Sequence, residues 1–183
     1  MYSLKAVGFT FSDDRTGILY CGLTIAWDYI ARTVTISMPG YVKRALQRFI
    51  HTSPKRMEDS PHKWNEPHIC VEVQYSAVPD TAPFLDADNK RHVQEVLGTF
   101  LFYSRAVDIT MLNAIGTIAM QQSTPTQVIM DAIVKLLNYA ASHPNAKLQF
   151  RARDMLLWIN SDASYLSETQ SQSMCNGYHF LSN

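Results

Sequence analysis

The sequence has few cysteines and no excess of charge of either sign. Its three cysteines, Cys21, Cys70 and Cys175, lie far apart and form no C-x-x-C pair. An odd number of widely spaced cysteines argues against a disulfide scaffold and against a cysteine-based zinc site. Lys plus Arg equals Asp plus Glu, at 16 each. A dedicated nucleic-acid binder usually shows a basic excess, so the net charge gives no support for that class.

Long hydrophobic runs are also missing. No apolar stretch reaches the roughly 18 residues that a membrane-spanning helix needs, and the first residues contain no apolar segment of signal-peptide length. Hydrophobic residues nevertheless make up 46% of the 183-residue chain, which is enough to bury a core. We therefore expect a soluble, intracellular protein of the cytoplasm or nucleus, with no membrane partner.

The first part of the chain predicts a hairpin and a helix. Residues 18–38 alternate and become β-branched in "TVTISM", with "DYIAR" as the turn. Pro39 then opens a helix capped by Ser37 or Met38. The apolar face of this helix would carry Val42, Leu46 and Phe49. Its basic residues fall largely on the other face: Lys43, Arg44 and Arg48.

The middle of the chain changes from a connection to helices. Residues 52–88 hold five of the eight prolines and no sustained period, so they either wrap over a surface or link two subdomains. Residues 89–145 regain a helical period of apolar residues. We expect three helices that pack together, the second capped by Asp108 and the third by Thr124, with Pro125 at its first position.

The last part predicts strands and carries the first candidate for chemistry. "KLQFRA" and "MLLWINSD" would form a hairpin around "RD", and "GYHFLS" reads as one more strand. Asp162 ends the second of these strands. A strand-end Asp often caps a turn, but a carboxylate there could also bind metal. Two-metal phosphodiester chemistry needs several carboxylates, so a single Asp is not sufficient.

Several strings point to one family. "SDASYLSE" after an apolar strand, followed by "QSQSMCNGYHFLS", resembles the start of the ribonuclease H domain of copia-type LTR retrotransposon polyproteins. "LYCGLTIAWDYIARTVTISMPGYVKRALQRF" resembles the segment after the polymerase palm of the same polyproteins. "VQEVLGTFLFYSRAVDITMLNAIGTIAMQQSTPT" with "LLNYAASHP" resembles the helical region between the two enzymes. The three similarities are collinear and cover essentially the whole chain.

The resemblance implies a fold and a division of the chain. The fold would be α+β: a β-hairpin with a thumb-like helix, a helical bundle, and an incomplete antiparallel sheet like that of ribonuclease H. The segments would be the end of the reverse transcriptase, a proline-rich linker, a helical connection and a truncated ribonuclease H start: 1–51, 52–88, 89–145 and 146–183. The parent would be an RNA-directed DNA polymerase and ribonuclease H that uses Mg²⁺ and binds an RNA/DNA hybrid or template-primer beside the rest of the polyprotein.

The resemblance also assigns the carboxylates. Asp162 corresponds to the first catalytic, metal-binding Asp of ribonuclease H, and Glu168 is too near in sequence to be the family's helix-borne Glu. Asp13 and Asp14 lie in a polar turn and do not match the polymerase Y-x-D-D hairpin. The resemblance therefore implies that both carboxylate sets are incomplete, that this chain alone has neither activity, and that it binds no Mg²⁺ tightly.

A local basic stretch is the second candidate. Residues 29–57 contain six Lys or Arg and no Asp or Glu. The plain interpretation is a solvated helix face, and the functional one is a surface that follows phosphates. The resemblance places this helix in or beside the polymerase thumb, which grips template-primer. It implies nucleic-acid binding by three of the six: Lys43, Arg44 and Arg48.

Other residue groups favour plain interpretations. His62, His68 and Cys70 lie in the proline-rich connection, where no regular geometry would fix metal ligands. Three aromatic residues in an apolar helical stripe are expected in the core: Phe100, Phe102 and Tyr103. Two rival interpretations remain open. One is a retroelement remnant retained as a nucleic-acid- or protein-binding module, which a contiguous basic patch would support. The other is an unrelated helical structural protein, which would lack a three-stranded ribonuclease H start.

Overall fold

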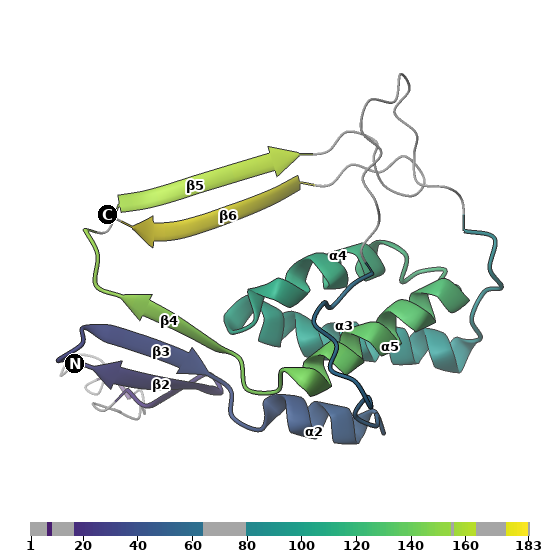
Figure 1. Ribbon diagram of the computed structural model, residues 1–183, viewed down its shortest axis with the longest axis horizontal. Helices are drawn as coiled ribbons and strands as arrows, with labels where there is room; N and C mark the ends of the chain where they lie inside the picture. Colours follow the sequence, from purple (N-terminus) through teal and green to yellow (C-terminus); the bar gives the residue numbers. More distant parts are fainter. Residues whose placement is uncertain (1–6, 9–16, 64–79, 155, 164–174, 183) are drawn as a thin grey trace.

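The computed structural model describes residues 7–8, 17–63, 80–154, 156–163 and 175–182. A four-stranded antiparallel sheet lies beside a group of helices, and a separate two-stranded hairpin lies above the sheet and α4 in the view of Figure 1. The elements are β1 (Leu19–Tyr20), β2 (Leu23–Asp28), β3 (Thr33–Ser37), α2 (Tyr41–Arg48), α3 (Ala87–Ala106), the 3-10 helix η1 (Ile109–Met111), α4 (Leu112–Met120), α5 (Gln127–Ser142), β4 (Lys147–Arg151), β5 (Leu156–Ala163) and β6 (Cys175–Ser182). The expected α+β class is confirmed.

The hairpin predicted over residues 18–38 is present with one extra turn. β2 and β3 pair antiparallel, with Ile25 opposite Ile36, and the predicted turn joins them. Cys21 and Gly22 both have positive φ, at 48° and 81°. Two such residues in succession form the tight two-residue loop that connects the strands of many β-hairpins. They separate the short β1 from β2, a break that the alternating pattern of residues 18–27 did not predict.

The register of the sheet sorts its residues into two unlike faces. Trp27 pairs with Val34, and Val34 pairs with Phe150, and directly opposed residues of an antiparallel pair share a face. The apolar sheet face therefore carries Leu23, Ile25, Trp27, Val34, Ile36, Leu148 and Phe150. The polar sheet face carries Thr24, Ala26, Asp28, Thr33, Thr35, Ser37, Lys147, Gln149 and Arg151. Leu23 and Ile36 pack against the helical core, so this core covers part of the apolar sheet face.

The predicted hairpin of "KLQFRA" with "MLLWINSD" is wrong. β4 pairs with β3, so that Leu148 lies opposite Ile36, and β5 pairs with β6. β3 and β4 come from distant parts of the sequence, and this register places their alternating apolar residues opposite one another. Local spacing cannot reveal such a partner, because it shows only which strands are neighbours along the chain. Among the described residues, the three strands do not form the single sheet that was expected.

The helices form one shared core. α3, α4 and α5 confirm the three predicted amphipathic helices, and α2 joins them through Val42, which is fully buried, and Ala45. The Tyr41 ring stacks on Tyr103 of α3 at 5.5 Å, and the Tyr41 hydroxyl donates to the Thr99 carbonyl at 2.7 Å. Other fully buried side chains of this core include Val93, Val96, Phe100, Met111, Ile133 and Leu136.

The helix starts differ from the predicted ones by a few residues. α2 is preceded by Gly40 in the left-handed conformation, φ 72°, and neither predicted side chain caps it. α5 begins after Thr126 rather than Thr124, and the Thr126 hydroxyl donates to the Asp80 carboxylate. The Asp108 side chain accepts from the Thr110 amide, so it caps the short 3-10 helix that precedes α4. Gly40 and Thr126 thus occupy the N-cap positions of α2 and α5 in place of the expected residues, and neither caps its helix through a side chain.

The described beginning of the proline-rich connection lies along α5. The His51 ring contacts Asn138 Oδ1 at 2.9 Å, and the Glu58 amide donates to Ser142 Oγ at 3.0 Å. Glu58 also forms an ion pair with Lys135. Residues 51–63 therefore wrap over the helical surface, which was one of the two expectations for this connection.

Candidate nucleic-acid interface and carboxylate site

The three predicted phosphate contacts lie on the exposed side of α2. Val42 and Ala45 turn inward, and the residues of the α2 basic face, Lys43, Arg44 and Arg48, are all exposed. Arg44 and Arg48 are one helical turn apart, so their side chains are neighbours. The geometry confirms the predicted face of the helix. All three cations lie on the short helix α2, which its buried side holds in place.

One member of this face already has an acidic partner. Arg48 Nη2 lies 3.2 Å from Glu95 Oε2 of α3, with both side chains well exposed. The Arg48 guanidinium also lies 5.5 Å from the centre of the Phe49 ring. Burial raises the pKa of Tyr41, and the positive charges of Arg44 and Arg48 oppose that rise. Arg48 is thus partly neutralised, whereas no described acidic residue pairs with Lys43 or Arg44.

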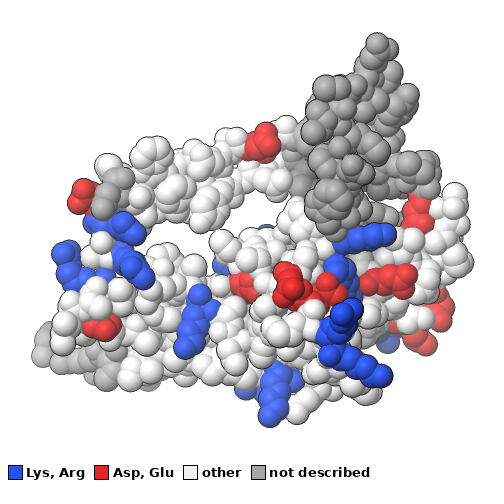
Figure 2. Space-filling view, in the orientation of Figure 1, with Lys and Arg blue, Asp and Glu red and all other residues white. Residues whose placement is uncertain are grey.

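The wider surface does not form one basic patch on the side shown in Figure 2. Lysines and arginines there are interspersed with acidic side chains over the helices. The other predicted basic residues, Arg32, Lys55 and Arg56, lie outside α2, in the β2–β3 turn and in the connection after the helix. The view in Figure 2 therefore lends no support to the contiguous basic patch expected of a retained binding module.

Asp162 lies near the end of β5, as the strand pattern predicted. It pairs with Asn176 of β6, it is exposed, and its Oδ1 accepts from the neighbouring Ala163 amide at 2.9 Å. Among the described residues, no group of three or more His, Cys, Asp or Glu is placed to hold a metal. A lone carboxylate leaves Mg²⁺ mostly hydrated. The described residues thus do not make a two-metal centre, and the Asp162 carboxylate contacts the adjacent amide within β5.

Several predicted candidates lie outside the described residues. Asp13, Asp14 and Glu168 are among them, as are His68 and Cys70. The aromatic stripe is described, and it differs from the expectation at one position. Phe100 and Tyr103 are buried, whereas Phe102 is 47% exposed. The prediction that Phe102 belongs to the core is wrong, because the stripe is wider than the side of α3 that the other helices cover.

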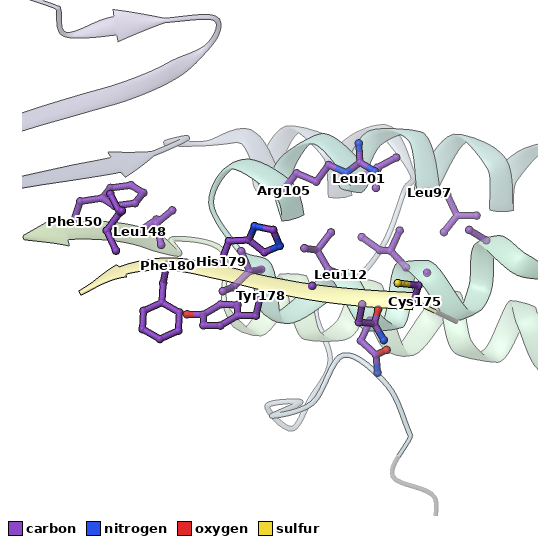
Figure 3. A pocket seen from close by; sticks show the side chains of 18 of the residues that line it. Leu97, Leu101, Arg105, Leu112, Leu148, Phe150, Cys175, Tyr178, His179 and Phe180 are labelled. Carbon is purple, nitrogen blue, oxygen red and sulfur yellow. The ribbon is translucent and has the colours of Figure 1, made fainter. Parts of the chain in front are cut away.

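A large groove was not predicted from the sequence. Its volume is about 1680 Å³, and it lies between α3 and α4, β4 and β6 (Figure 3). Apolar side chains from all four elements line it: Leu97, Leu101, Leu112, Leu148, Phe150 and Phe180. The groove depends on β4 pairing with β3, so the error in the predicted strand partner also hid the groove.

Comparison with protein-family models, with curated proteins and with solved structures gives no match for the chain. None of the helices in the described ranges has the length and apolar character of a membrane-spanning helix.

Proposed function

We propose that the chain is the nucleic-acid-contacting part of a copia-type retrotransposon polyprotein, a reverse transcriptase with ribonuclease H. The observation that carries this proposal is the α2 basic face, which buried Val42 and Ala45 hold toward solvent. The collinear strings of the sequence support the family, and the order of hairpin, basic helix, helical group and terminal hairpin agrees with the segments that the resemblance implies.

The contact would be made to phosphates rather than to bases. The Tyr41 hydroxyl bond to α3 and the buried side of α2 fix the helix, so Lys43 and Arg44 can meet the backbone of an RNA/DNA hybrid without reordering the chain. Arg48 must first exchange Glu95 for a phosphate. Phosphate contacts position a nucleic acid but carry no sequence information. We expect weak, salt-sensitive and sequence-independent binding.

A second candidate is favoured by a specific observation. β5 and β6 form a two-stranded hairpin, and the third predicted strand pairs elsewhere. That arrangement was expected of an unrelated helical structural protein with a small sheet. Such a protein would need no basic helix face, so a test of binding through α2 separates the two functions.

Salt dependence of binding to a short RNA/DNA hybrid tests the proposal. Each phosphate contact contributes a slope of roughly 0.9 in log K against log salt on B-DNA. The triple variant Lys43→Gln, Arg44→Gln and Arg48→Gln should flatten the slope by up to about three. The matched control, Arg91→Gln with Lys147→Gln and Arg153→Gln, removes three exposed cations elsewhere and should retain the slope. Equal slopes for both triple variants would refute the α2 interface.

A change at the Arg48–Glu95 ion pair provides a second test, in which the expected effect on the salt slope has the opposite sign. Glu95→Gln leaves Arg48 without its acidic partner and removes one negative charge beside the α2 basic face. We expect tighter binding of the hybrid and a steeper salt slope. The variant Asp88→Asn removes an exposed acidic charge at the start of α3 instead, and it should have a smaller effect.

A further inference from the structure

Two strand edges that no other described strand pairs with face the groove. Among the described strands, β4 is the last of its sheet and β6 pairs with β5 alone. The lining includes every residue from Leu148 to Arg151 and every residue from Cys175 to Leu181. Consecutive residues of a strand point to opposite faces, so a run without gaps indicates that each strand presents its edge to the groove. A groove between two edges favours an extended chain over a helix.

The hydrogen-bond pattern of β4 shows which groups are available. The Ala152 amide donates to the Arg32 carbonyl at 2.9 Å, and hydrogen-bonded pairs alternate along an antiparallel ladder. Leu148 and Phe150 therefore direct their backbone groups toward β3. Gln149 and Arg151 direct theirs to the free edge, where an added strand would pair with them.

The side chains at this edge determine what the added strand must carry. The apolar sheet face ends at Leu148 and Phe150, and α3 and α4 continue it with Leu101 and Leu112 (Figure 3). The polar sheet face carries Lys147 and Arg151 at the same edge. The charged residues among the described lining are all arginines: Arg105, Arg151 and Arg153. Complementary charge on a partner strand would be acidic.

We propose that this groove binds an extended segment of another protein in which apolar and acidic residues alternate, and that the segment adds a strand to β4. Its apolar residues lie against Leu148, Phe150 and the helices, and its acidic residues lie beside Lys147 and Arg151. Main-chain hydrogen bonds to Gln149 and Arg151 hold the strand, and the side chains give specificity. This site is separate from the α2 basic face, so it goes beyond the proposed contact with nucleic acid.

A synthetic peptide of about seven alternating valines and glutamates serves as the probe. Titration followed by fluorescence anisotropy should show saturable binding to the whole chain. Hydrogen exchange should show new protection at the amides of Gln149 and Arg151, while those of Leu148 and Phe150 change little because they already pair with β3. Saturable binding without protection at Gln149 and Arg151 would overturn strand addition at β4.

Charge variants and control peptides test the specificity. Arg151→Glu replaces an opposite-charge cross-strand pair by a like-charge one and should weaken binding roughly three- to thirtyfold. Arg91→Glu, the same change on exposed α3 surface, should leave binding unchanged. A peptide of alternating valine and lysine should bind more weakly than the acidic one. Equal binding of the two peptides, or the same amide protection produced by self-association without peptide, would overturn the proposal.

Discussion

At the scale of single residues, Tyr103 is the least satisfied buried group among the described side chains. It is 1% exposed, and its hydroxyl has no hydrogen-bond partner in the described part of the chain. Burial is the main reason why the pKa of Tyr103 is raised to about 12, and Asp108 raises it further, while the approach of the hydroxyl to the Ala146 backbone, which does not reach hydrogen-bond geometry, lowers it. The ring packs between Tyr41 and Phe100. The ring is therefore packed within the aromatic part of the core, whereas the hydroxyl makes no hydrogen bond of normal geometry among the described residues.

We expect Tyr103→Phe to leave the free energy of unfolding unchanged or to raise it by about 1 kcal/mol. The substitution keeps the ring and removes a buried hydroxyl without a partner. Urea denaturation of both proteins measures the difference. A loss of more than about 1 kcal/mol would reveal a hydrogen bond of this hydroxyl.

The raised pKa of Tyr103 also predicts a pH dependence. Between the ordinary value of 10.0 and about 12, the folded state keeps a proton that the unfolded state releases. The contribution of this group to the free energy of unfolding is therefore fully present below pH 10, and it is lost as the pH rises toward 12. The difference in unfolding free energy between Tyr103→Phe and the parent chain should grow in favour of the variant over this range. A difference that is constant from pH 8 to 11 would contradict the assignment.

Asp162 gives a prediction about metal. Its carboxylate is exposed and contacts the adjacent amide, so we expect Mg²⁺ to bind more weakly than about 1 mM, below the range of built oxygen-ligand sites. Amide shifts near β5 during a Mg²⁺ titration provide the measurement. Tight, saturable binding that is lost in Asp162→Asn would show that a second ligand completes a site there.

At the scale of elements, the helices and the terminal hairpin differ in what they bury. Leu136 of α5 is fully buried, whereas Leu157 of β5 is 61% exposed. We expect Leu136→Ala to cost about 2–5 kcal/mol, because it leaves a cavity in the shared core. Leu157→Ala should cost well under 1 kcal/mol. Thermal or urea unfolding of this matched pair tests the contrast, and equal losses would place the β5–β6 hairpin in the cooperative core.

The elements also show how far the sequence could predict this structure. The period of "GYVKRALQRFI" identified the side of α2 that faces solvent, because helical amphipathicity is a local property. The start of α2 was misplaced, because Gly40 adopts a left-handed turn that competes with the Pro39 start. The partner of β4 was wrong, because pairing with β3 depends on residues distant in the chain. The groove could not be predicted, since it exists only once that pairing is known.

At the scale of the whole molecule, the two ends of the chain depend on each other. β3 pairs with β4, and α2 packs against α3 and α5. Residues 80–183 alone lack β3 as well as buried Met38, Val42 and Ala45. We expect this fragment to unfold less cooperatively, and we expect the addition of residues 1–63 to restore helicity. Circular dichroism of the separate and mixed fragments measures this, and full cooperativity of the fragment alone would contradict it.

The register of the terminal hairpin also determines how the molecule responds to mechanical tension. Leu156 and Ser182 pair where β5 leaves the body of the chain and β6 approaches the C-terminus (Figure 1). A pull on the C-terminus therefore loads the β5–β6 ladder at one end, and its hydrogen bonds break one after another instead of sharing the force. Thr33 pairs with Arg151 in the same way where β3 begins and β4 ends. The strand β6 would peel away at low force and lengthen the tether before the helical core carries the load.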